Sequence, residues 1–389
     1  MKITNLDVYV LRGPDGGRPH WVSHFIVPTA NEILVRLRTE DGVEGFGLAT
    51  CYSGIEAPLN AFKSGIGEQI LGEDATAPER LYEKLFGLTA QRLAHEKGWG
   101  RESLIRISAA VDLACWDIMG KIAGLPLYKL LGGTDDRIRL YASSGELRDP
   151  GARREEAEAR LAEGFDTMKI RVHDFDEAVD IDHISDIARH MQGRMKISVD
   201  CNQAFRLTQN GDAPLWSLDR AKRFVDAAAD VGLAWVEEPL FGEWHEEIAR
   251  LTTYSRVPVA GGELHVMGYR ELARMMKMGC YNIFQPDAMW AGGITQCLKV
   301  AALCKEEGIR FTPHCWSNGF GFIANAHVFA ASGFAGEELF EYPLSPPGWT
   351  PEGRDQIFSQ PFLHENGWFA MPQTPGLGFE INQETLEKY

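Results

Sequence analysis

Positive charge is scarce in this sequence. The chain has 39 Lys and Arg residues against 55 Asp and Glu residues, which gives a formal net charge of −16. Such an acidic protein is a poor partner for nucleic acid or for an anionic membrane surface. If its substrate is itself an acid, positive charge must be concentrated locally, by a metal ion and a few basic side chains.

The sequence also lacks the signals of several other classes of protein. The seven cysteines are an odd number without paired metal-type spacing, so neither a disulfide framework nor a cysteine metal site is predicted. We expect free buried thiols, as in a reducing cytoplasm. No apolar run is long enough to span a membrane, and the N-terminus alternates like a strand instead of carrying a secretory signal. We therefore expect a cytoplasmic protein that acts on a small molecule.

The order of local patterns divides the chain into parts. Alternation over residues 3–11 and 32–39 predicts an antiparallel meander, and helical patterns follow over residues 78–94 and 103–122. From residue 137, short apolar runs alternate with helical stretches, which is typical of a TIM-type barrel. The expected strand ends are near Ser143, Val172, Asp200, Glu237, Glu263, Pro286, His314 and Glu341. From residue 348 onward, the alternation of strand and helix patterns ends.

Three acids close consecutive apolar runs: Asp200, Glu237 and Glu263. They lie about 30 residues apart, which is the length of a strand-plus-helix unit. Parallel barrel strands would bring them together at the C-terminal face, where barrel enzymes place their chemistry. Because three converging carboxylates repel one another and offer oxygen ligands, they favour a hard cation such as Mg²⁺.

Further side chains of catalytic type follow the other strands. Lys169 and Arg171 lie two residues apart and therefore face the same way, and Asp287, His314 and Glu341 follow later strands. In our interpretation, Mg²⁺ binds a substrate carboxylate and stabilises an enediolate. His314 moves a proton while Asp287 fixes its tautomer. The two cations add positive charge, and Glu341 could donate a hydrogen bond to the enediolate if its pKa is raised.

Six short motifs, in order, match one family. They are Lys169-Ile-Arg171, Val199-Asp200-Cys-Asn202, Trp235-Val-Glu237-Glu-Pro239, Ala260-Gly-Gly-Glu263, Gln285-Pro-Asp287 and Thr312-Pro-His314. The chain resembles the mandelate racemase subgroup of the enolase superfamily over essentially its whole length. The resemblance implies an α/β fold with a (β/α)₇β barrel over residues 131–347. An α+β capping domain would comprise residues 1–130, with residues 348–389 returning to it.

One departure from the family pattern bears on the reaction. The second strand usually carries Lys-x-Lys, whereas here the second position is Arg171, a poor base because guanidinium stays protonated. A racemase needs two bases, and His314 is the clear one. We therefore expect a sugar-acid dehydratase that forms a 2-keto-3-deoxy acid, with Lys169 or His314 taking the α-proton. A racemase, an epimerase, a sugar-lactone cycloisomerase and a catalytically silent metal-binding barrel are the alternatives.

Substrate selection is expected from the cap loops and the strand ends. The family places such loops over the barrel mouth, and a polar, aromatic-rich cover suits a polyol acid. The candidate substrate-binding residues are His20, Trp21, His24 and Tyr52 in the cap, and Asn202, His265 and Trp316 in the barrel. Because the family's barrels commonly assemble, we also expect a homo-oligomer.

Overall fold

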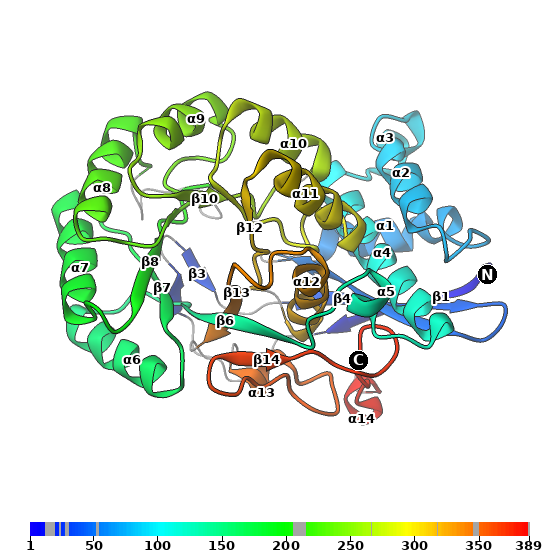
Figure 1. The fold of residues 1–389 in the computed structure, drawn as a ribbon. Coiled ribbons are helices and arrows are strands. Elements are labelled where there is room, and N and C mark those ends of the chain that lie inside the picture. Colours follow the sequence, from blue (N-terminus) through cyan, green and yellow to red (C-terminus); the bar gives the residue numbers. More distant parts are fainter. Residues whose placement is uncertain are drawn as a thin grey trace.

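A helical and sheet-containing cap lies beside a closed barrel (Figure 1). The computed structural model describes residues 1–11, 20–22, 25–27, 31–51, 54–204, 215–265, 267–316, 318–344 and 350–387. For residues 20–22, 25–27, 31 and 51 it describes the backbone alone.

The cap is built on an antiparallel sheet covered by one long helix. Strand β4 (Asn31–Thr39) pairs with β1 (Ile3–Leu11) and with β5 (Glu44–Cys51). Helix α4 (Arg101–Ala123) packs so closely on β5 that a Cβ atom added at Gly47 would lie 1.9 Å from the carbonyl oxygen of Ala110. A side chain is therefore excluded at this position, and glycine sets the distance between the helix and the sheet.

The remaining cap elements are short. They are the hairpin β2 (His20–Val22) and β3 (Phe25–Val27), the helices α1 (Glu56–Lys63), α2 (Pro78–Leu88) and α3 (Arg92–Lys97), and the 3₁₀ turn Ile66–Gln69. The prediction of a single helix over residues 78–94 was wrong. The chain turns after α2, where the Thr89 hydroxyl donates to the carbonyl of Phe86, and Gln91 is extended before α3 begins.

The barrel strands follow one another around a parallel sheet in chain order. They are β6 (Arg137–Ser144), β7 (Thr167–Arg171), β8 (Lys196–Asp200), β9 (Val236–Glu237), β10 (Val259–Gly261), β11 (Ile283–Phe284), β12 (Arg310–Phe311) and β13 (Phe340–Leu344). β13 pairs with β6, and the Thr312 hydroxyl after β12 donates to the Leu339 carbonyl before β13. The predicted α/β barrel with an N-terminal cap is confirmed.

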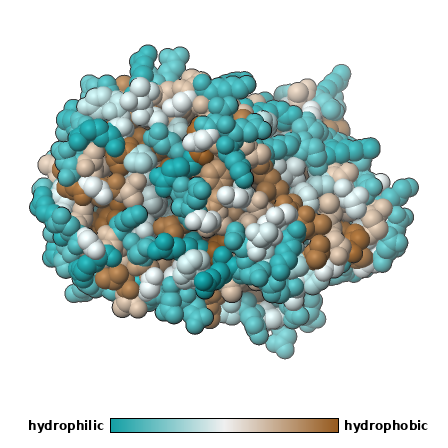
Figure 2. Space-filling model, viewed as in Figure 1, coloured by the Kyte–Doolittle hydropathy of each residue, from teal (hydrophilic) through white to brown (hydrophobic). Residues whose placement is uncertain are grey.

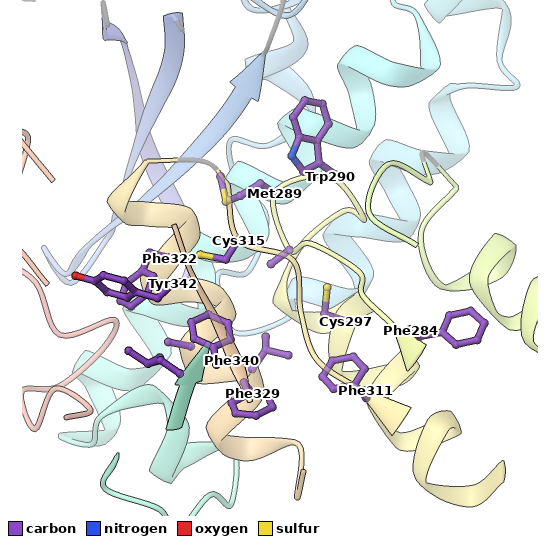
Figure 3. Close-up of a cluster of buried hydrophobic side chains, with 14 of the residues drawn as sticks. Phe284, Met289, Trp290, Cys297, Phe311, Cys315, Phe322, Phe329, Phe340 and Tyr342 are labelled. Atoms are coloured by element: carbon purple, nitrogen blue, oxygen red, sulfur yellow. The ribbon is translucent and has the colours of Figure 1, made fainter. Parts of the chain in front are cut away.

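Helices surround the strands on the outside of the barrel (Figure 1). They are α6 (Pro150–Ala162), α7 (Glu177–His190), α8 (Leu218–Asp230), α9 (His245–Tyr254), α10 (Tyr269–Met278), α11 (Ile294–Glu307) and α12 (Gly319–Ala331), with α5 (Leu127–Leu130) leading into the barrel. Figure 3 shows part of the interior that they cover. There the Phe322 ring of α12 meets the rings of Phe340 and Tyr342 on β13 at 5.6 and 5.5 Å.

The tail contacts both parts of the molecule. It contains α13 (Pro351–Arg354), β14 (Trp368–Ala370) and α14 (Gln383–Leu386). β14 pairs antiparallel with the barrel strand β6. Farther on, the carbonyl of Gly376 accepts from the amide of Leu127 at 2.8 Å, and the amide of Leu377 donates to the buried carboxylate of Asp117 in α4 at 3.0 Å.

Buried polar contacts join the cap to the barrel. Glu32 on β4 accepts hydrogen bonds from the Thr50 hydroxyl at 2.9 Å and from the side chain of Asn318, which caps α12. Burial raises the pKa of Glu32 to about 7, although these hydrogen bonds oppose the rise. Asp112 of α4 accepts from the amide and hydroxyl of Thr295 on α11. Each contact places a carboxylate from the cap on the start of a barrel helix.

The surface and the thiols have the character expected from composition. Hydrophilic residues cover most of the outer ring in Figure 2, with hydrophobic ones showing between them.

The six described cysteines are free and buried. Within the described ranges, every helix is too short or too polar to cross a bilayer.

Candidate active site

Most of the predicted site residues meet at the C-terminal ends of the barrel strands. Lys169 and Arg171 lie on β7, Asp200 ends β8, Glu237 ends β9, Glu263 follows β10, Asp287 follows β11, His314 follows β12 and Glu341 lies on β13. All of these side chains are buried. Parallel strands bring their C-terminal ends to one face of a barrel, so residues far apart in the sequence share one polar centre.

Lys169 contacts three carboxylates of this centre. Its Nζ lies 2.5 Å from Glu237 Oε1, 2.8 Å from Glu341 Oε1 and 3.9 Å from Asp200 Oδ2. Burial alone would lower the pKa of Lys169, but these three carboxylates raise it above its ordinary value. In this arrangement Lys169 is a fixed positive charge and a poor proton acceptor.

Arg171 holds the adjacent carboxylate and its turn. Its guanidinium donates to the side chains of Asp200 and Asn202 and to the carbonyl of Ser144, and it lies over the Trp316 ring with 5.1 Å to the centroid. Asn202 has a φ of 47°, and its amide donates to Asp200 Oδ1 at 2.8 Å. A planar fork of donors suits these several acceptors better than an ammonium would.

Asp287 orients the His314 ring through its Nδ1 atom. Its Nδ1 lies 2.9 Å from Asp287 Oδ2, and its Nε2 lies 3.4 Å from Glu263 Oε1. Asp287 Oδ1 accepts from the amide of Met289 and from Asn325 Nδ2, both at 2.8 Å. Burial opposes protonation, but Glu263 and the bond to Asp287 raise the pKa of His314 to about 9. Asp287 therefore assigns the proton to Nδ1 and leaves Nε2 facing the site.

Glu341 differs from its expected role. It accepts from the Ser143 hydroxyl at 2.7 Å, the Cys315 amide at 2.8 Å and the Trp316 indole at 3.0 Å, besides Lys169. Although burial opposes ionisation, the charge of Lys169 and these donors lower the pKa of Glu341 to about 2. The expectation that a raised pKa would let Glu341 donate a hydrogen bond was wrong, because donors from several elements stabilise its ionised form.

The other expected substrate residues have different outcomes. Asn202 and Trp316 join the network around Arg171. His265 pairs with Glu271 of α10 at 3.2 Å, and its ring packs beside that of His245. The cap candidates are not tested: the side chains of His20 and Trp21, and all of His24 and Tyr52, lie outside the described residues.

Sequence reasoning missed three side chains that support the site. Ser143 donates to Glu341, Gln285 donates to Glu237 Oε2 at 2.8 Å, and Asn325 donates to Asp287. Asn325 had one available signal, since it and His327 are the two polar side chains in the apolar run of α12. A buried amide there needs a partner, and the partner is the residue that orients His314.

The three predicted metal ligands fit a divalent cation by chemistry and charge. Asp200, Glu237 and Glu263 are buried oxygen donors at neighbouring strand ends. Burial, together with the charges of Asp200 and Glu237, raises the pKa of Glu263 to about 7 against the pull of His314. Clustered carboxylates of this kind repel one another, and the repulsion is relieved by a cation.

The comparisons with known proteins agree with this geometry. Residues 5–132 match the family described as mandelate racemase / muconate lactonizing enzyme, N-terminal domain, and residues 152–385 match the family described as enolase C-terminal domain-like. The chain belongs to the mandelate racemase subgroup of the enolase superfamily.

Similar proteins are named for reactions of sugar acids and a sugar lactone. An arabinonate dehydratase from Saccharolobus solfataricus is 29% identical over 363 residues, which cover 92% of this chain and 90% of the relative. A D-galactarolactone cycloisomerase from Agrobacterium fabrum is 28% identical over 366 residues, covering 92% and 90%. The solved structure of an L-talarate dehydratase from Polaromonas sp. JS666, complexed with Mg and L-glucarate, has a TM-score of 0.80 at 25% identity and covers 99% of this chain and 96% of its own.

Proposed function

We propose that this enolase-superfamily protein is a Mg²⁺-dependent hydro-lyase that dehydrates a sugar acid, an aldonate or aldarate, to a 2-keto-3-deoxy acid. The observation that carries the proposal is the His314–Asp287 pair, which faces Glu263 across from the fixed charges of Lys169 and Arg171. The dehydratase names of its relatives support this reaction class.

Asp200, Glu237 and Glu263 would hold the metal. When bound, Mg²⁺ would position the substrate carboxylate and offset the negative charge that develops on the enediolate. Lys169 lies 2.5 Å from Glu237 and therefore competes with a cation for that carboxylate. The raised pKa of His314 depends chiefly on the charge of Glu263, so a cation taken up by Glu263 favours the neutral imidazole.

The proposed reaction uses one base on one face. Neutral His314 takes the C2 proton at Nε2, and the bond electrons move into the enediolate. The imidazolium then returns this proton to the departing C3 hydroxyl, so that water leaves and an enol remains, which tautomerises to the 2-keto acid. Asp287 stabilises the imidazolium between the two steps. Lys169 and Arg171 remain charged throughout and position the substrate's anionic end.

Cycloisomerisation is a second candidate, favoured by the cycloisomerase relative. It would use the same C2 proton transfer without net loss of water. The distinction is made by incubating a library of mono- and diacid sugars and their lactones with the protein and Mg²⁺ in deuterated water. Dehydration gives a semicarbazide-reactive keto acid, whereas lactone isomerisation or epimerisation gives deuterated product at constant composition.

The role of His314 is tested by His314→Asn. This variant should lose turnover by at least 100-fold while it still binds Mg²⁺, because general acid–base groups contribute about 10²–10⁴ in rate. The control is His190→Asn, which changes an exposed histidine on α7 that pairs with Glu158. Near-normal turnover in His314→Asn would exclude His314 as the proton carrier.

The remaining expectations belong to this proposal. They are the division into residues 1–130, 131–347 and 348–389, a cytoplasmic location, a homo-oligomeric assembly, and the substrate contacts in the cap. Light scattering after size-exclusion chromatography tests the assembly, and a monomer would contradict it.

A further inference from the structure

A second group of metal-ligating side chains lies in the segments that follow β9 and β10. His245 begins α9, His265 lies in the loop between β10 and α10, and Glu271 lies in the first turn of α10. Among the described residues, these three form a group whose donor atoms all lie within 4.8 Å of one another. The two helices α9 and α10 neighbour each other on the outside of the barrel (Figure 1).

The spacing of the donors suits a small tetrahedral ion. His265 Nδ1 lies 3.2 Å from Glu271 Oε1, and His245 Nε2 lies 3.8 Å from the same oxygen. In a tetrahedral zinc site with bonds of about 2.0–2.1 Å, neighbouring ligand atoms are about 3.3 Å apart. The shorter of these two distances already matches that spacing, and the longer exceeds it by about 0.5 Å.

One ring nitrogen of this group is left without a hydrogen-bond partner among the described residues. His245 Nε2 is a buried nitrogen without a hydrogen-bond partner in the described part of the chain. An unpaired imidazole nitrogen next to a carboxylate is a costly arrangement that a cation would relieve.

Backbone amides of Met267 and Gly268 donate hydrogen bonds to two of the proposed ligand residues. The amide of Gly268 donates to the His265 carbonyl at 2.9 Å, and the amide of Met267 donates to Glu271 Oε2 at 3.3 Å. Gly268 has a φ of 56°, and a Cβ atom there would lie 2.3 Å from the carbonyl oxygen of Ala291. These bonds link the backbone of His265 to the segment that carries Glu271.

We propose that His245, His265 and Glu271 form a second divalent-metal site, selective for a zinc-class ion over Mg²⁺, with water as the remaining ligand. Two imidazoles and one carboxylate are a ligand set typical of Zn²⁺, whereas Mg²⁺ prefers oxygen ligands alone. A bound ion would join α9 to α10 through the loop after β10. That loop also carries Glu263, two residues before His265, so the ion would brace a residue of the active site.

The test is zinc binding by the full chain with excess Mg²⁺ present. Protein stripped with a chelator is titrated with Zn²⁺, and bound metal is measured by calorimetry and elemental analysis. We expect one equivalent of zinc in the wild type, a higher melting temperature with zinc, and at least tenfold weaker binding in His245→Asn and in His265→Asn. Circular dichroism checks that these variants are folded, and His190→Asn, with its exposed histidine, should bind as the wild type does.

Asp200→Asn separates this site from the three acids of the barrel mouth. It should keep its zinc equivalent, because none of the proposed ligands is changed. If the histidine variants fail to fold, Co²⁺ bound to the wild type must show the visible spectrum of a tetrahedral site with nitrogen ligands. The proposal is overturned if the wild type binds no zinc under Mg²⁺, if zinc binding is lost in Asp200→Asn but kept in the histidine variants, or if bound Co²⁺ shows an octahedral spectrum.

Discussion

Asp287→Asn is the sharpest test of how the site positions its base. Asp287 makes three contacts: Oδ1 accepts from the Met289 amide and from Asn325, and Oδ2 faces His314 Nδ1. An asparagine can keep both contacts of Oδ1, so the shape of the site and most of its hydrogen bonding remain. The one change is that an NH₂ group now faces the imidazole.

This NH₂ group donates to Nδ1 and therefore moves the imidazole proton to Nε2. Nε2 is the nitrogen that faces Glu263, and in this tautomer it has no lone pair with which to accept a proton. We expect kcat to fall by about 10²–10⁴, which corresponds to about 3–5 kcal/mol of transition-state stabilisation. The free energy of unfolding should change by far less, since both hydrogen bonds to Oδ1 are kept and the contact with Nδ1 is only reversed in direction.

The assay is the initial rate of keto-acid formation and of α-proton exchange in deuterated water, with urea unfolding measured in parallel. A matched control is Asp180→Asn, an equally isosteric change at a buried carboxylate of α7 that pairs with Arg220 at 2.8 Å. This control should lose stability and keep its kcat. If folded Asp287→Asn retains kcat within tenfold of the wild type, Asp287 does not fix the tautomer of His314.

Three further substitutions probe other features. Arg171→Lys should lower kcat/KM at least tenfold, because one ammonium cannot serve the several acceptors of the guanidinium; unchanged kinetics would refute this role. Glu32→Gln removes a carboxyl group whose pKa is raised by burial to about 7 in the folded protein. Because the unfolded chain ionises this group at a lower pH, the wild type loses stability as the pH rises from 4.5 to 7. Its stability relative to the wild type should therefore increase by on the order of 3 kcal/mol over that range in urea unfolding, and a pH-independent difference would contradict the assignment. Gly47→Ala should destabilise the cap by about 3 kcal/mol or more through its collision with Ala110, whereas Gly336→Ala, where nothing lies within 4 Å, should be nearly neutral.

The fold and the meeting of the site residues could be predicted because both depend on periodicity. Side chains at consecutive strand ends must converge in a parallel barrel, and Asp200 and Glu237 do lie at one centre, where both face Lys169. The pairing of Asp287 with His314 followed from the same rule.

Features that depend on packing across elements could not be predicted. The ionised state of Glu341 depends on donors from β6, β7 and the loop after β12, and no sequence spacing encodes their sum. The contact of His265 with Glu271 on the next helix was not predicted either, because the sequence marks His265 only as a residue after a strand end. The break between α2 and α3 contains neither proline nor glycine and is formed by local hydrogen bonds.

The bond between Leu377 and Asp117 has a consequence for how the protein is made. The two residues are 260 positions apart, with the whole barrel between them. During translation, α4 leaves the ribosome long before Leu377 has been synthesised. The amide of Leu377 is the last of the hydrogen-bond donors to the buried Asp117 carboxylate to be made. The cap should therefore mature after the barrel, although its strands are synthesised first.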